Sequence, residues 1–200
     1  MEGLYSDIRV ILFEPRGLIR SGVCSFLQQN NVKVIPCSSV EHLTEELCAL
    51  TDEQKYLLVG AGGLGNMLPG LVRLIHSSRK MPLTSMVYLP MNDTLLTKML
   101  TAAGARRCLT EDVLEGQLLK EIAAADAIQQ RREYFSPAEL NIVLDYAAGM
   151  QTRDIANRRK CSYKTVFTFK RNARIRMNID THAGWTLLMS HLSQLTSLYD

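Results

Sequence analysis

The chain has no apolar run close to the roughly eighteen residues that span a membrane, and its first residues, MEGLYSDIRV, lack a secretory pattern. Its five cysteines are odd in number and lack the pair spacing of metal sites, and its four histidines form no ligand motif. We therefore expect a cytoplasmic protein with reduced cysteines, no membrane contact, no metal and no cofactor. A redox-sensing cysteine is the minor alternative.

Acidic residues are scarce in one stretch of the chain. Residues 131–177 carry 11 Lys+Arg against 4 Asp+Glu, whereas residues 1–130 carry 12 against 14 and residues 178–200 carry 0 against 2. Such asymmetry is typical of a phosphate-binding module joined to a near-neutral domain. An ordinary solvated basic face is the alternative interpretation of a charged run.

Residues 135–179 have the apolar spacing of three short helices, of which the third is basic. A capping box and a proline open the first helix, a glycine able to take positive φ ends it, and hydroxyl side chains cap the next two. These markers are Ser136, Pro137, Glu139, Gly149, Thr152 and Ser162. The pattern predicts a helix-turn-helix module whose third helix runs from Tyr163 to Met177.

The predicted third helix has two chemically different faces. The apolar face, which should pack onto the first two helices, consists of Val166, Phe169, Ala173 and Met177. The opposite face carries groups that contact base edges, thymine methyls and phosphates when a helix lies in a major groove. On this face, Lys164, Thr165, Phe167, Thr168 and Arg171 are expected nearest the bases. The residues expected mainly at phosphates are Lys160, Lys170, Arg174 and Arg176. We predict that this helix binds double-stranded DNA.

The segment from Phe135 to Ile179 resembles the NarL/LuxR-type helix-turn-helix family without a gap. The residues that carry the resemblance are Pro137, Glu139, Gly149, Ile155, Ala156, Thr165 and Val166. Two positions depart from the family pattern, because Arg159 stands where an apolar residue is usual and Phe169 replaces a common histidine. The resemblance implies a transcription regulator, not an enzyme, with a locally rearranged core.

The same resemblance implies a fourth helix starting at Asp180 or Thr181, which in the family commonly forms part of a dimer contact. The residues proposed for that contact are Trp185, Leu188 and Leu192, and a core position is the alternative for such a stripe. Because one small module reads only about half a site, we expect a homodimer or a heterodimer with another response regulator. In kind the chain is similar to the auxiliary regulators that pair with the response regulator of the Rcs phosphorelay.

The first 125 residues alternate short apolar strands with amphipathic helices. The predicted strands are Ile8 to Phe13, Val32 to Ile35, Tyr56 to Val59, Ser85 to Leu89 and Arg107 to Leu109, with helices near 17–29, 40–50, 67–77, 93–103 and 112–130. This alternation predicts an α/β fold with a doubly wound, five-stranded parallel sheet, followed by a small all-α four-helix domain. The expected divisions are a first domain at 1–126, a linker at 127–134 and a DNA-binding domain at 135–200.

The first domain resembles a response-regulator receiver, most clearly over residues 8–23 and 102–119. Phosphorylation in that family needs an acceptor carboxylate, further carboxylates for Mg²⁺ and a cation. The corresponding positions here are Glu14, Gly60, Ala61, Leu89 and Glu111. The acceptor, the metal ligands and the cation are thus missing. The resemblance implies a pseudo-receiver that serves pairing and not phosphorylation.

Two other functions stay open. The loop from Gly60 to Gly65 fits G-x-G-x-x-G after an apolar strand, the context of a nucleotide-binding turn. Against a nucleotide-binding sensor or enzyme, the loop follows the third strand, and Pro69-Gly70 interrupts the next helix. The other alternative is an interaction protein that titrates a partner regulator without binding DNA, and the basic third helix argues against it.

Overall fold

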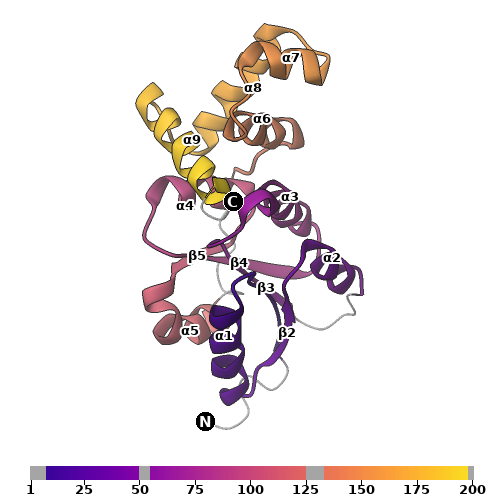
Figure 1. Cartoon of the computed structure of the whole chain (residues 1–200), viewed down its shortest axis with the longest axis vertical. Helices are drawn as coiled ribbons and strands as arrows, with labels where there is room; N and C mark the ends of the chain where they lie inside the picture. The colour runs from indigo at the N-terminus through magenta and orange to yellow at the C-terminus, as the bar shows by residue number, and fades with distance from the viewer. Residues whose placement is uncertain (1–7, 50–54, 125–132, 198–200) are drawn as a thin grey trace.

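The computed structural model describes residues 8–49, 55–124 and 133–197. Its sheet has five parallel strands in the order β2-β1-β3-β4-β5 (Figure 1). The strands are β1 (Arg9–Phe13), β2 (Lys33–Cys37), β3 (Lys55–Gly60), β4 (Leu83–Leu89) and β5 (Arg107–Thr110). The predicted doubly wound sheet is confirmed, and the strand ends lie within two residues of the predicted ones.

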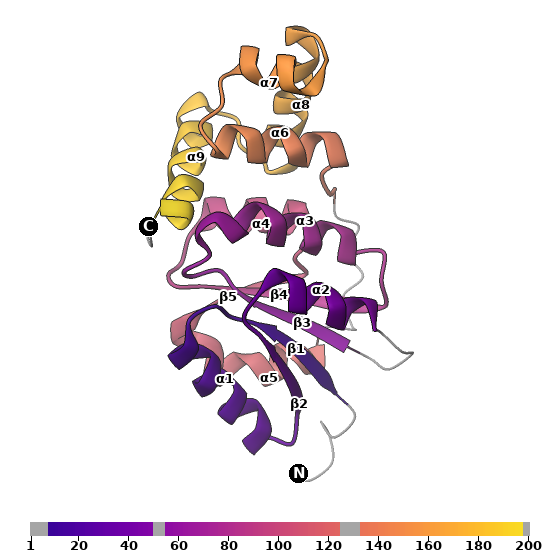
Figure 2. The same cartoon turned by 45° about the vertical axis from the view of Figure 1, so that its right-hand side comes forward.

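Helices cover both faces of the sheet (Figure 2). One face carries α1 (Gly17–Gln29) and α5 (Leu114–Ala124), and the other carries α2 (Val40–Cys48), α3 (Leu68–Ser78) and α4 (Thr94–Ala103). Because successive strand residues point to opposite faces, Val10 and Leu12 join the α1 side while Ile11 and Phe13 join the α3 side. Within the described ranges, no helix has both the length and the apolar composition needed to cross a bilayer.

The C-terminal part consists of four helices, as predicted. They are α6 (Pro137–Ala147), α7 (Thr152–Arg159), α8 (Tyr163–Arg176) and α9 (His182–Ser197). The capping box at Ser136 and Glu139 is confirmed, as are the positive φ of Gly149 (77°) and the cap that Ser162 provides by accepting from the Thr165 amide. These features fix where α6 begins and ends and where α8 begins.

The predicted cap of α7 is wrong. Thr152 is already the first helical residue, and the preceding residue, Gln151, makes no side-chain cap hydrogen bond. The Thr152 hydroxyl instead lies 2.7 Å from the Tyr146 hydroxyl on α6. The contact with Tyr146 therefore uses the hydroxyl that a local capping rule would assign to the backbone. The first amides of α7 lack a side-chain acceptor from the cap residue.

A single hydrophobic cluster joins the two parts of the chain. It runs from the α3 and α4 side of the sheet through Phe135 to α9, whose side chains Trp185, Leu188 and Leu192 are 3%, 0% and 1% exposed. In Figure 2, α9 descends from the helical domain toward α4. Their side chains dock the helical domain onto the receiver-like domain of the same chain, which is the core position given as the alternative, and a dimer contact through them stays a prediction.

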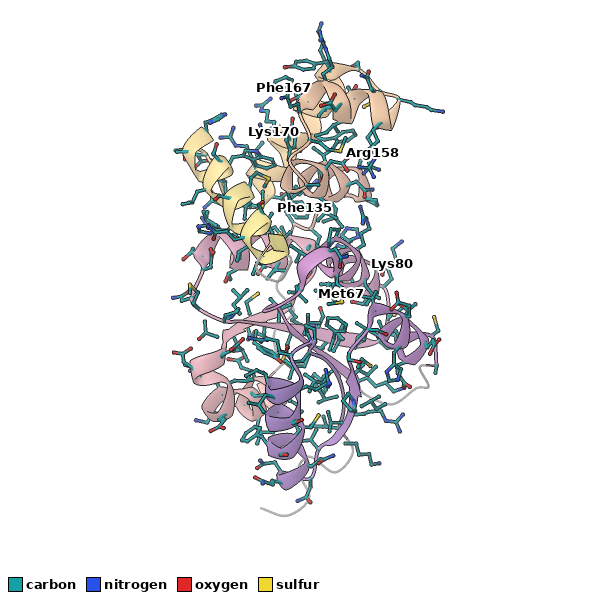
Figure 3. The ribbon with its side chains drawn as sticks, in the orientation of Figure 1. Met67, Lys80, Phe135, Arg158, Phe167 and Lys170 are labelled. Atoms are coloured by element: carbon teal, nitrogen blue, oxygen red, sulfur yellow. The ribbon has the colours of Figure 1, made fainter. Side chains whose placement is uncertain are left out.

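Polar contacts reinforce this junction. The Phe135 amide donates to the carbonyl oxygen of Ala102 on α4 (2.8 Å), and the Lys98 ammonium donates to the carbonyl oxygen of Asn178 (3.1 Å). Phe135, expected to begin the DNA-binding domain, is thus already seated against the first domain, as Figure 3 shows. The predicted linker at 127–134 lies mostly outside the described residues, and the domain limits stay a prediction.

His76 is a buried titratable group at this junction. Its Nε2 lies 2.8 Å from the Phe135 carbonyl oxygen, and the residue is 9% exposed. Burial lowers the pKa of His76 below its ordinary value of 6.5, and the nearby charges of Arg79 and Lys80 lower it further, while the Phe135 carbonyl opposes them. Below pH about 6.5 the unfolded chain therefore takes up a proton that the folded chain resists, so stability falls with acidification.

We expect the free energy of unfolding to fall less between pH 7.5 and pH 5 in His76→Gln than in the wild type. Glutamine keeps an N–H donor for the Phe135 carbonyl but does not titrate, and the other histidines contribute alike to both proteins. Urea unfolding of the two proteins at both pH values measures the difference. Equal losses would show that His76 does not cause the pH dependence.

Candidate functional site

The outer face of α8 is the candidate nucleic-acid interface. Lys164, Phe167, Thr168 and Arg171 are exposed there, while Val166 and Ala173 are fully buried against α6 and α7. Figure 3 shows Phe167 on the part of the helical domain that faces away from the sheet. The docking of the two domains therefore leaves this face of α8 uncovered. Two cations and an aromatic ring are available along it for contact with a nucleic acid.

Three cations predicted for this face have partners inside the protein instead. The Lys170 ammonium lies 4.6 Å from the ring centre of Tyr146 and 5.0 Å from that of Trp185, and burial lowers its pKa. Arg174 donates to the carbonyl oxygens of Ile179 and Asp180. Arg174, predicted to point outward, and Lys170, predicted to meet a phosphate, are thus both turned toward partners within the chain, because each side chain is long enough to reach back to the turn or rings beside it.

Arg176 also departs from the prediction. Its Nε donates to the Glu139 carboxylate at 2.7 Å, and Glu139 is 2% exposed and carries the capping box of α6. The pair holds the last turn of α8 against the start of α6. Arg176 therefore stabilises the module and is not free to meet a phosphate without breaking this pair.

Arg159, one of the two departures from the family pattern, has a similar structural role. It makes two hydrogen bonds to Asp145, with Nε to Oδ2 at 2.8 Å and Nη2 to Oδ1 at 3.0 Å. Asp145 is 3% exposed, so this bidentate pair replaces the apolar contact expected between α6 and α7. The second departure, Phe169, is half-buried and packs against the cluster formed by Ile142, Ile155, Ala156 and Val166.

The start of α7 contributes a region that the sequence did not single out. A recess of about 870 Å³ lies there, lined in part by Gln151, Arg153 and Asn157. The first backbone amides of α7 point to the N-terminal end of the helix, where anions are favoured. Lys160, in left-handed conformation at the end of the same helix, is exposed. The structure thus adds Arg153 on α7 to Lys160, which the sequence had already predicted as a phosphate contact.

In the receiver-like domain, the carboxyl ends of the strands meet around a buried ion-pair network. Glu14 is fully buried and accepts hydrogen bonds from the Arg16 side chain at 2.9 and 2.7 Å and from the Tyr88 hydroxyl at 2.6 Å. Arg16 also bonds Glu111 at 2.6 Å, just after β5. Arg16 therefore bridges the predicted Glu14 and Glu111, and Tyr88 adds a second donor to Glu14; the prediction missed both Arg16 and Tyr88.

The network keeps its two donors, Arg16 and Tyr88, protonated. The hydrogen bond to Glu14 raises the pKa of Arg16, and burial raises the pKa of the Tyr88 phenol, as does its bond to Glu14. Both groups therefore stay protonated and donate to the Glu14 carboxylate. All the close donors around Glu14 are thus supplied by the chain itself.

Two glycines at and just after the end of β3 make room for this network. A Cβ at Gly60 would overlap Oε2 of Glu14, and one at Gly62 would lie 2.5 Å from the guanidinium carbon of Arg16. Ala61 and Leu89, also expected at the lost site, are 1% exposed. The Gly60 to Gly65 loop thus approaches protein side chains where a nucleotide-binding turn would approach a pyrophosphate.

The residues at this position do not fit the Mg²⁺ ion of a receiver. Both oxygens of Glu14 already accept hydrogen bonds, and the Arg16 guanidinium lies between Glu14 and Glu111, where a dication would be repelled. β3 ends at Gly60, which offers no carboxylate to accept a phosphoryl group. Elsewhere in the described ranges, no three acidic, cysteine or histidine side chains gather as metal ligands.

No protein-family model matches the chain, and no curated protein sequence matches it. Solved structures do match it. RcsB from Salmonella enterica serovar Typhimurium, bound to promoter rprA with the phosphomimetic BeF₃⁻, has 18% identity and a TM-score of 0.56, over 92% of this chain and 99% of that one. The two-component response regulator RcsB in complex with DNA has 18% identity and a TM-score of 0.52, over 92% and 98%.

RcsB of Salmonella typhimurium, in a study of conformational dynamism for DNA interaction, matches over 94% of this chain and 98% of that one, with 18% identity and a TM-score of 0.51. At this identity the likeness concerns the fold. The chain therefore has a response-regulator-like fold, with a receiver-like domain followed by a helix-turn-helix domain.

Proposed function

We propose that the chain is a sequence-specific DNA-binding transcription regulator of the NarL/LuxR type that catalyses no reaction and works in the cytoplasm without being phosphorylated. The observation that carries this proposal is the outer face of α8, where Lys164, Phe167, Thr168 and Arg171 are exposed on a capped helix. The RcsB structures with which the chain shares its fold include complexes with DNA.

The residues of this surface would make two kinds of DNA contact, to bases and to phosphates. Lys164, Thr165, Phe167, Thr168 and Arg171 would lie nearest the bases when α8 enters a major groove. Arg153 on α7, Lys160 just after it and the first backbone amides of that helix would meet phosphates. Lys170, Arg174 and Arg176 would act indirectly, by holding α8 in its orientation.

Phosphorylation independence is supported by the Glu14–Arg16 network. It fills the receiver site with internal donors and leaves neither an acceptor at Gly60 nor a place for Mg²⁺. The receiver-like domain would then serve pairing with a second copy or with another response regulator. Since the apolar side of α9 is buried within the chain, that pairing would use a different surface.

Arg171→Ala tests the assignment of α8. If Arg171 makes a bidentate base contact, its loss should weaken binding to a selected DNA site by about 1–3 kcal/mol, with a smaller loss on random-sequence DNA. The matched control is Arg153→Ala on α7, which should weaken both kinds of binding alike and reduce the salt dependence. Titrations of labelled duplexes over a salt series measure both. Equal losses for Arg171→Ala on the two DNAs would contradict its role in reading bases.

A further inference from the structure

Two aromatic side chains are exposed side by side on α8. Tyr163 is 53% exposed and Phe167 is 45% exposed, and their ring centres lie 4.7 Å apart with the planes at 63°. They occupy the first and second turns of the helix, on the face that points away from the receiver-like domain. The edge-on contact holds both rings in place while leaving about half of each to solvent.

The polar groups around this pair are largely satisfied within the protein. The Thr165 hydroxyl lies 2.8 Å from the Ser162 hydroxyl, and the Thr168 hydroxyl donates to the Lys164 carbonyl oxygen at 3.0 Å. Lys170 is turned toward Tyr146 and Trp185. The first turns of α8 therefore present two apolar rings to solvent, flanked by the cations of Lys164 and Arg171.

We propose that the Tyr163–Phe167 pair reads thymine by contacting the C5-methyl groups in the major groove. The inference rests on the proposed DNA binding and identifies the thymine methyl as the group that the DNA site must contain. In that groove the thymine methyl is the apolar feature that distinguishes one base from another. A ring that already packs against its neighbour loses little rotational freedom when it contacts a thymine. The free energy of burying the methyl group therefore adds directly to the binding affinity.

The pair also restricts where thymine must occur. Tyr163 and Phe167 are four residues apart, one helical turn, and they touch. They would therefore face the same or adjacent base pairs. Lys164 lies between the two aromatic residues in the sequence, and Arg171 follows Phe167 by one helical turn, so the preferred site would have a thymine step beside groups that accept hydrogen bonds from these cations.

The test replaces thymine by deoxyuridine, which removes the methyl group and leaves the Watson–Crick edge unchanged. A duplex selected from a random pool by the full chain is resynthesised with each thymine in turn changed to deoxyuridine. We expect one or two positions at which affinity falls about fourfold, the worth of burying one methyl-sized group. Phe167→Ala should bind the thymine and deoxyuridine duplexes equally at these positions, and Phe167→Leu should retain part of the discrimination.

The outcomes separate this inference from the function on which it rests. No binding to any selected duplex would overturn the proposed DNA binding and the inference with it. Specific binding with equal affinity for every thymine and deoxyuridine duplex would overturn the inference alone. If Phe167→Ala changed the oligomeric state in sedimentation and left the discrimination intact, the pair would be a protein contact, and the inference would again fail.

Discussion

Replacing Glu14 by alanine is expected to lower the free energy of unfolding by about 3–5 kcal/mol, the usual cost of removing one partner from a buried ion pair. The carboxylate is fully buried and accepts hydrogen bonds on both oxygens from Arg16, with a further one from the Tyr88 hydroxyl. Its loss leaves the buried Tyr88 hydroxyl without this acceptor and removes two of the hydrogen bonds that the Arg16 guanidinium donates. The strands β1 and β4 lose the polar link between their ends.

Urea unfolding of the full chain measures the effect, with Glu111→Gln as the matched control. Glu111 binds the same arginine, but its side chain is 25% exposed. Water can therefore replace the lost contact, and the expected cost is about 1 kcal/mol or less. If Glu14→Ala were no more destabilising than Glu111→Gln, the ion-pair network would not be the element that fills the receiver site.

Replacing Trp185 by alanine is expected to lower the free energy of unfolding by a similar amount, about 3–5 kcal/mol, as for other buried aromatic residues cut to alanine. The Trp185 ring is 3% exposed, stands edge-on to Tyr146 with ring centres 5.5 Å apart, and lies under the Lys170 ammonium. The substitution opens a cavity where α6, α8 and α9 meet. It should not change the oligomeric state under native conditions.

Leu187→Ala is the matched control for this prediction. It removes an apolar side chain from the same helix at a position that is 50% exposed, so we expect only a few tenths of a kcal/mol. Urea unfolding and sedimentation velocity on the two variants distinguish a role of Trp185 in the core from a role in a dimer interface. A Trp185→Ala protein of normal stability that had lost self-association would restore the dimer contact as the role of this helix.

The sequence predicted those parts of the fold that depend on local pattern. Apolar alternation located the strands, and the capping residues Ser136 and Ser162 located the starts of α6 and α8, because a cap is decided by groups within four residues. Thr152 shows the limit of such rules. Its hydroxyl was expected to cap α7, yet it meets Tyr146 on another helix, which no local pattern reveals.

The candidate site was predictable only in outline. The missing acceptor at Gly60 could be read directly, but the groups that fill the space could not, because Tyr88 reaches Glu14 across 74 positions of sequence. The long cations were also misplaced. Helical spacing predicts the direction of a Cβ, but the charged groups of Lys170 and Arg176 lie several bonds beyond it. Their partners are an aromatic ring and a carboxylate that other helices hold in place.

The most direct test of the account is sequence-specific DNA binding with and without beryllofluoride. The chain is titrated into selected and random duplexes over a salt series, alone and with a response-regulator partner whose acceptor aspartate has been replaced by alanine. Beryllofluoride and Mg²⁺ can then act only on this chain. We predict specific, salt-steep binding that depends on Arg171 and has the same affinity with and without beryllofluoride. An affinity that rises with beryllofluoride, or no sequence preference in either mixture, would contradict the account.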